Sequence, residues 1–455
     1  MSGLNSILES AKRSLNANQY GIGVTSHNIA NAGVAGYSRQ RVILSASPAE
    51  KMQFGYLGSG VDIKSVQRMR EKYIDQQSYT INANLGQASQ RQQILTMTES
   101  LLQEPSDSGL NSMMTQFFGS FQDLATHPEE SSSRNAVLQR ASLMTDSFHR
   151  LSEGLTSTKA NIINDVDSKI EKINTLLKTA AGVDAAIVTA ISQGVVPNDL
   201  KDQRDKYLSD LSSLVNIRTS EGENGSLSVA IGGTSVISNG NFQQLKSTTA
   251  SGSMVITTMN SATAVNITGG EIGGLMKLYN TTINGYQKNL DDLAQTLIAK
   301  VNGVHAAGYG LGNPPTTGID FFTGIDAATI SVNGAVQQNI NNIAASADGA
   351  PGNNENAIAL SQLQNAKAMN GDNNTVFQFY NGIVSGMGSE IQSLESETQS
   401  AELVLEQVNA QQSSVSGVSL DEEMTNLIKF QHGFDASARV INTINSMFDV
   451  LFRMT

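Results

Sequence analysis

The chain has 455 residues, a formal net charge of -12, no cysteine and no tryptophan. An acidic chain without basic blocks or interleaved aromatic residues does not fit a nucleic-acid partner or an anionic membrane surface. The lack of cysteine excludes disulfides, thiolate metal ligands and cysteine nucleophiles, and the length predicts two or more domains.

Neither a cleavable secretory signal nor a membrane-spanning segment is expected in this chain. Residues 1–15 carry Glu9, Lys12 and Arg13 and contain no continuous apolar run, which does not fit a cleavable secretory signal. No stretch is long and apolar enough to span a bilayer, so no membrane insertion is expected. Without further information the default location is the cytoplasm.

The first predicted element is a helix with apolar residues at heptad spacing. One column, which recurs every seven residues, contains Leu8, Leu15, Ile22 and Ile29. A second column between them contains Leu4, Ala11, Asn18 and Thr25. This spacing is typical of a helix with a narrow seam that winds around another helix.

An irregular stretch rich in glycine and tyrosine follows, over residues 31–60, and predicts an extended, hairpin-forming connector. The pattern turns helical from about residue 66 to 102, and Pro105 with the following Ser, Asp and Gly residues predicts a turn. Further helices are predicted over residues 110–125, 131–180 and 198–214.

Between about residues 215 and 270 charges become rare, and short alternating apolar runs are separated by Gly, Ser and Asn turns. The runs include Leu227, Val229 and Ile231, then Val236 and Ile237, Val255 and Ile256, and Val265 and Ile267. This pattern predicts a small β-rich domain inserted into a helical body. A long helix over 271–305, a Gly, Asn and Pro-rich region to 354, and helices over 356–369 and 375–413 follow.

The final predicted helix carries a seam like that of the first. One column contains Leu420, Leu427, Phe434, Ile441 and Phe448. The companion column contains Met424, Gln431, Ala438, Asn445 and Phe452. The helix starts with a capping box, Ser419 followed by Glu422, and an acidic first turn that complements the helix dipole, so these acids are interpreted as caps.

Matching seams at the two ends predict that the ends of the chain pair with each other. Polar entries such as Asn18 and Asn445 lower the stability of a seam but can fix its register. The alternative is that each column is the ordinary buried stripe of a globular helix. The predicted fold is therefore mainly α, with a long helical bundle or coiled coil built from both chain ends and an inserted β-rich domain.

The predicted division has three parts. Residues 1–60 with 415–455 form a terminal coiled-coil domain, residues 61–214 with 271–414 form a helical body, and residues 215–270 form an inserted outer domain.

Residues of the types used in catalysis or metal binding are scattered along the chain. The five histidines show no pair at a helical ligand spacing, which does not fit a metal site. Neither a nucleophile elbow nor a phosphate-binding loop is present. Asp291 and Asp292 fit the solvated face of an amphipathic helix. No catalytic residue, cofactor or metal is expected.

One local string is more specific. It comprises Asn28-Ile29-Ala30-Asn31 and Gly36-Tyr37-Ser38-Arg39-Gln40. This string resembles the N-terminal motif of the bacterial flagellar axial proteins, the rod, hook and junction components. Within that family, Ser38-Arg39-Gln40 is similar to the first of the two hook-filament junction proteins. The C-terminal strings Gly417 to Met424 and Ala436 to Ile441 resemble the same member, so the resemblance covers essentially the whole chain.

The resemblance implies a structural adaptor that joins hook to filament by helical polymerisation through its terminal helices. The implied partners are further copies of the chain, the hook protein, the second junction protein toward the filament, and a cytoplasmic export chaperone at the C-terminal helix. It also implies a secreted protein at the hook-filament junction, exported by a type III route without a cleavable signal.

Two other functions remain open at this point. A flagellin or hook-type subunit is the nearest alternative, and an axial-scaffold hydrolase is more distant because no region shows a carboxylate pair. The motif also has a purely structural interpretation. Asn31 and Gly33 can end a helix in left-handed conformations, and Gly36 and Tyr37 begin an extended arm.

Overall fold

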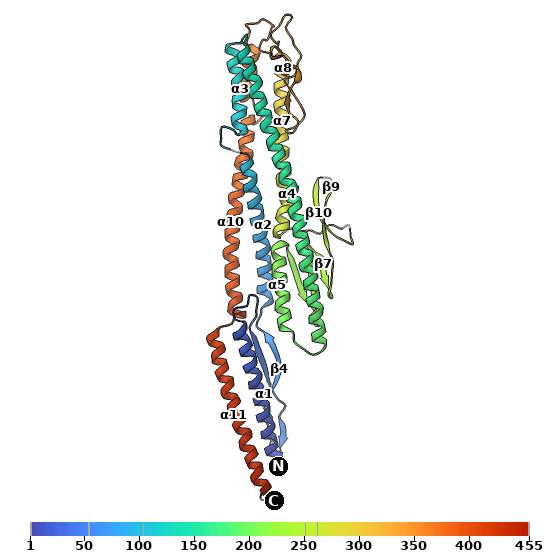
Figure 1. Ribbon diagram of the computed structural model, residues 1–455, viewed down its shortest axis with the longest axis vertical. Helices are drawn as coiled ribbons and strands as arrows, with labels where there is room; N and C mark the ends of the chain where they lie inside the picture. Colours follow the sequence, from blue (N-terminus) through green and yellow to red (C-terminus); the bar gives the residue numbers. More distant parts are fainter. Residues whose placement is uncertain (1, 53–54, 103, 251, 262, 454–455) are drawn as a thin grey trace.

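Helices run along the whole length of an elongated molecule in the computed structural model, and the predicted mainly α fold is confirmed (Figure 1). The structure describes residues 2–52, 55–102, 104–250, 252–261 and 263–453. The two chain ends lie together at one end of the rod, below a long helical body that carries strands on one side (Figure 1).

The lower part of the rod, here called the terminal unit, contains both terminal helices and two small sheets. Its helices are α1 (Ser2–Asn31) and α11 (Leu420–Arg453). Its strands are β1 (Gln40–Ala46), β2 (Glu50–Met52), β3 (Gly55–Leu57) and β4 (Val61–Arg68). Strands β1 and β4 pair antiparallel, and β2 pairs with β3 as a hairpin.

The predicted helix start at residue 66 is wrong. Val66 pairs with Val42 in the β1–β4 ladder, which extends to Arg68. The next helix therefore begins only at Lys72, after the short linker Met69–Glu71.

The body is an array of helices, most of them long, that contact one another side by side. They are α2 (Lys72–Leu102), α3 (Leu110–Thr126), α4 (Ser131–Ser192), α5 (Asn198–Leu214), α6 (Gly270–Lys277), α7 (Asn284–His305), α9 (Glu355–Gln362) and α10 (Val376–Ser416). A π-helical segment, Leu278–Ile283, joins α6 to α7. Helix α4 extends past the predicted end at residue 180, because Asp184 and Ile187 continue its buried face.

The β-rich part lies against α4 (Figure 1). Its four-stranded antiparallel sheet contains β5 (Ile217–Glu221), β6 (Leu227–Ile231), β7 (Thr234–Ser238) and β8 (Asn241–Phe242) in that order. Strands β9 (Leu245–Ala250) and β10 (Ser253–Thr258) form a separate hairpin. The predicted strand at Val265 and Ile267 is not present. Both side chains are buried, and the segment meets β10 through an isolated antiparallel bridge between Ala264 and Thr257 and a backbone bond from the Val265 N–H to the Ile256 carbonyl.

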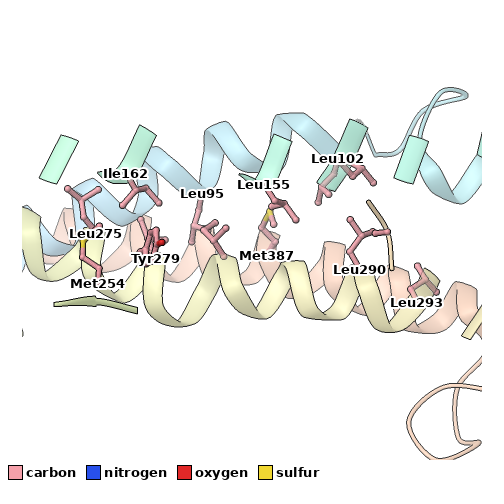
Figure 2. Packing of buried hydrophobic residues seen from close by; sticks show 14 of the residues in the cluster. Leu95, Leu102, Leu155, Ile162, Met254, Leu275, Tyr279, Leu290, Leu293 and Met387 are labelled. Atoms are coloured by element: carbon pink, nitrogen blue, oxygen red, sulfur yellow. The ribbon is translucent and has the colours of Figure 1, made fainter. Parts of the chain in front are cut away.

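The main hydrophobic core belongs to the body. Figure 2 shows leucines such as Leu95, Leu155 and Leu290 packed between neighbouring helices, together with Met387 and Tyr279. Within the described residues, no side chain of α1, β1–β4 or α11 is part of this core. The terminal unit therefore contributes none of the apolar burial that holds the body together.

The end of the body far from the chain ends, here called the apex, is built from residues 306–354. It contains β11 (Phe322–Thr323), β12 (Ser331–Val332), α8 (Gly334–Gln338) and a 3-10 turn at Ile340–Asn342. Arg134 is buried there and donates to the carbonyl oxygens of Pro128 and Ile343, while burial lowers its pKa to about 10. The helix predicted over 356–369 is shorter, because α9 ends at Gln362 and only a 3-10 turn follows to residue 365.

One part of α4 corrects the expectation that no stretch could span a bilayer. A window of this helix is long and apolar enough by length and composition, and 28 % of it is buried in the structure. Its small residues Ala180 and Ala181 are buried in the main core, and Asp184 forms an ion pair with Arg204 of α5. One face of this window is thus packed within the body.

Candidate assembly site at the terminal helix pair

The two terminal helices run antiparallel and touch through small and polar side chains. Ser437 Oγ donates to Ser14 Oγ at 2.9 Å. A Cβ atom at Gly21 would lie 2.6 Å from the Phe430 ring. Such contacts require backbones that approach closely, and glycine and serine allow that approach.

Within a single chain, the residues of the predicted assembly seam differ in burial. The columns that remain half-buried are Leu8, Leu15, Ile22 and Ile29 on α1, and Leu427, Phe434, Ile441 and Phe448 on α11. In the companion column, Ala438 is half-buried, while Met424 is 56 % exposed and both Gln431 and Asn445 are exposed. Leu420 is also exposed, and the side chain of Phe452 lies outside the described residues.

The buried column of α11 is one that the apolar pattern did not indicate. It contains Glu423, Ser437 and Ile444, with half-buried Phe430 at the same heptad spacing. On α1 the buried residues include Ala11, Thr25 and Asn28. A search for large apolar residues missed this column because two of its members are a serine and a glutamate.

The motif residue Asn28 forms the centre of a hydrogen-bonded clasp at the top of the terminal helix pair. Its Oδ1 accepts from the hydroxyl of Tyr37 at 2.7 Å and from the backbone N–H of Gln40 at 2.9 Å. Its Nδ2 donates to the carbonyl of Gln40 at 2.9 Å and to Glu423 Oε2 at 3.0 Å. The Asn28 amide thus ties α1 to α11 and to residues 36–40, the segment that leads from α1 into β1 and is here called the arm.

Arg39 binds the first turn of α11. Its Nε donates to Glu423 Oε1 at 2.8 Å, and its Nη1 donates to Glu422 Oε2 at 2.8 Å. Glu423 is only 2 % exposed, and its charge is balanced inside the protein by Arg39, while its Oε2 accepts from Asn28. Only half of the predicted capping box is present. The backbone N–H of Glu422 lies 3.5 Å from Ser419 Oγ, but the Glu422 side chain binds Arg39.

The arm also binds α5 of the body. The backbone N–H of Ser38 donates to Asp202 Oδ2 at 3.0 Å, and Gln40 Nε2 donates to Asp199 Oδ1 at 2.9 Å. With Asp205, these carboxylates recur every three residues along α5. No predicted site residue included these carboxylates, although their three-residue spacing on one helix face was the available signal.

The remaining motif residues act locally. Asn31 Nδ2 donates to the carbonyl of His27 at 2.9 Å, one turn earlier in α1. Gly36 has φ +84, a conformation that side chains disfavour, and it lets the chain turn from α1 into the arm. Burial raises the pKa of Tyr37 well above its ordinary value, and the carboxylates of Asp199 and Asp202 add to the rise.

Comparison with known proteins places this arrangement in a family. Residues 95–322 match the family model described as the flagellar hook-associated protein FlgK helical domain. Flagellar hook-associated protein 1 of Bacillus subtilis is 30 % identical over 492 aligned residues, which cover 97 % of this chain and 96 % of that protein. The chain belongs to the flagellar hook-associated protein 1 family.

Other matches agree with that membership. Flagellar hook-associated protein 1 of Salmonella typhimurium is 25 % identical and is covered over its whole length. The solved structure of the flagellar hook junction protein FlgK from Burkholderia pseudomallei has a TM-score of 0.65 at 16 % identity, covers 75 % of this chain and is itself covered completely, which shows a shared fold. Residues 411–454, which include α11, match the C-terminal model of the flagellar basal body rod FlgEFG proteins.

Members of this family are structural components of the bacterial flagellum. Within the part of the chain that the structure describes, no group of three or more metal-binding side chains is close enough to hold an ion. His305 illustrates a structural role, because its Nδ1 bonds the carbonyl of Ile319 and its Nε2 accepts from the N–H of Ala344. That the chain has no catalytic activity remains a prediction.

Proposed function

We propose that this chain is a structural adaptor of the bacterial flagellum that joins hook to filament as the first junction protein. Family membership supports this role, and the terminal helix pair is the observation that carries its mechanism. The pair lies outside the hydrophobic core of the body and exposes large apolar side chains. They include Leu420, Met424, Ile428, Met447 and Val450. Exposed apolar side chains on paired helices favour contact with another protein surface.

The terminal pair is proposed as the polymerising part. Each half-buried apolar column, such as Leu8, Leu15 and Ile22 on α1, leaves part of its surface uncovered in a single chain. A neighbouring copy would cover these side chains through a head-to-tail interface. Such an interface does not close on itself and so produces a helix of subunits.

The proposed division keeps three parts. The terminal part takes in residues 1–68 and 417–455, because β4 extends to Arg68 and α10 of the body extends to Ser416. The helical body forms a middle layer, and residues 215–270 form an outer part on the side of α4 (Figure 1).

The proposed partners follow from this arrangement. They are other copies of the chain, the hook protein on one side and the second junction protein on the filament side. An export chaperone would cover exposed apolar side chains of α11, such as Met424 and Met447, before assembly. The chain would leave the cell by flagellar type III export, without a cleavable signal.

Immunogold electron microscopy of isolated hook-basal bodies and intact flagella tests the proposed position. Gold on a tag placed in the exposed turn at Gly252, on the β9–β10 hairpin, should mark one narrow band between hook and filament. Labelling along the whole filament would instead indicate a flagellin-type subunit. Labelling along the whole hook would indicate a hook-type subunit.

A further inference from the structure

The terminal unit and the body meet at a polar joint. The chain crosses between them at two short linkers, Met69–Glu71 and Gly417–Ser419. Because the described residues of the terminal unit contribute nothing to the main core, apolar packing does not fix the angle between the two parts. Ion pairs and hydrogen bonds must therefore supply most of the orientation.

Arg68, the last residue of β4, and Arg70, in the linker that follows, share three carboxylates of the body. Arg68 Nη1 lies 2.6 Å from Asp202 and 2.9 Å from Asp205, both on α5. Arg70 Nε lies 2.9 Å from Asp75, in the first turn of α2. All five side chains are largely buried, with exposed side-chain fractions of 9 to 14 %.

The pairing around Arg70 is uneven. Its Nη1 lies 3.4 Å from Asp205 and 3.9 Å from Asp202, beyond normal hydrogen-bonding distance. A movement of roughly 0.5 Å would bring Nη1 to hydrogen-bonding distance of Asp205. Asp202 is also held by the backbone N–H of Ser38, so Asp205 is the acceptor most free to exchange.

Open space flanks the arginines on two sides. One cavity of about 660 Å³ and another of about 380 Å³ are both lined by Arg70, Asp75, Tyr79 and Asp205. Water in these cavities can solvate a guanidinium or carboxylate group while it changes partner. A fully packed joint would not allow that exchange.

The arm attaches the terminal unit to the body beside these ion pairs. The backbone N–H of Arg39 donates to the carbonyl of Ser416 at 2.8 Å, at the end of α10. Gln40 binds Asp199 on α5. The terminal unit is therefore attached by the arm near Gly417 and by exchangeable ion pairs near Met69.

We propose that this joint is an electrostatic hinge. When this pairing is weakened, Arg68 and Arg70 exchange between Asp75, Asp202 and Asp205, and the terminal unit takes more than one angle to the body while the arm acts as the pivot. Salt and loss of one carboxylate both loosen the hinge. This inference concerns the single chain and holds whether or not the proposed junction role does. In an adaptor, which rests on the proposed function, the hinge would let one subunit fit tubes of different geometry.

Distance measurement between two spin labels tests the hinge on the full chain. Because the chain has no cysteine, Gln19→Cys on α1 and Lys178→Cys on α4 give two exposed labels, one on each part. Pulsed electron resonance then gives the distance distribution at about 0.01 M and about 1 M salt. We expect one narrow distribution at low salt, and a broader or split one at high salt.

The variant Asp205→Asn should broaden the distribution already at low salt, and Asp75→Asn serves as a second variant in case the first fails to fold. The matched control is Asp62→Asn, which removes the ion pair with Arg13 inside the terminal unit and should leave the distribution unchanged. An unchanged distribution in high salt and in the folded variants would overturn the hinge. So would a wild-type distribution at low salt as broad as that of the variants.

Discussion

Gly21 of α1 lies directly beneath the Phe430 ring of α11, so close that an added Cβ would be 2.6 Å from the ring. The same relationship recurs one turn away, where a Cβ added at Gly433 would lie 2.6 Å from Oδ1 of Asn18. The terminal pair is therefore held at a distance that only small residues allow.

Replacement of Gly21 by alanine should weaken the terminal helix pair. The added methyl group must push the Phe430 ring or separate the helices, at a cost of about 1–3 kcal/mol. Native-state hydrogen exchange of α1 and α11 measures this cost locally. The control is Gly23→Ala, which has no atom within 4 Å and should stabilise the helix by about 0.5–1 kcal/mol. Equal effects of the two variants would refute the close contact.

Removal of the Arg39 side chain should open the clasp. Arg39→Ala leaves the buried carboxylate of Glu423 with Asn28 as its remaining side-chain donor, at a cost of about 3–5 kcal/mol. We expect faster proteolysis of residues 1–60 and 415–455, with the melting temperature of the body unchanged. Arg41→Ala is the control, because Arg41 is exposed and forms no ion pair with another described residue. Comparable proteolysis of the two variants would contradict the role of Arg39.

Acid should destabilise the apex through His305. Burial lowers the pKa of His305 to about 4, against an ordinary value near 6.5. The unfolded state therefore binds the proton first, so stability is complete above about pH 6.5 and falls toward pH 4, by about 3 kcal/mol. Hydrogen exchange at Ala344, whose N–H binds His305 Nε2, reports this loss after correction for intrinsic exchange. In His305→Gln the pH dependence should shrink, whereas in the exposed control His127→Gln it should not. A pH dependence that is the same in all three proteins would rule out His305 as its source.

Replacement of Ile444 tests whether the buried column of α11 holds the terminal helix pair together. Its side chain is 3 % exposed, and Ile444→Asp would bury an unpaired carboxylate in the terminal pair. Because α11 contributes nothing to the main core among the described residues, the body should keep its melting temperature while filament attachment and motility are lost. Thr443→Asp, one residue earlier and exposed, should be tolerated. Unfolding of the body by Ile444→Asp, or loss of motility in both variants, would contradict this assignment.

Local patterns predicted the helices well where the chain carries clear boundaries. Helix α5 runs from Asn198 to Leu214, as expected, because Pro197 precedes it and an alternating apolar run follows it. The boundary near residue 66 failed because Val66 and its neighbours fit a helix or a strand equally well. Only pairing with β1, which is a distant contact, decides between them.

The candidate site could be predicted only in outline. Heptad spacing correctly indicated that both chain ends are seam helices, but it favoured large apolar residues and so selected Met424 in place of Glu423. The acids at the start of α11 had a sufficient local explanation as caps. Their contact with Arg39 joins opposite ends of the chain, and no local pattern contains that information.

Electron microscopy of cells that lack this chain tests the central claim most directly. If the chain joins hook to filament, these cells should carry complete hooks without filaments, and filaments should return when the wild-type chain is expressed again. Filaments of normal length on cells that lack the chain would contradict the account.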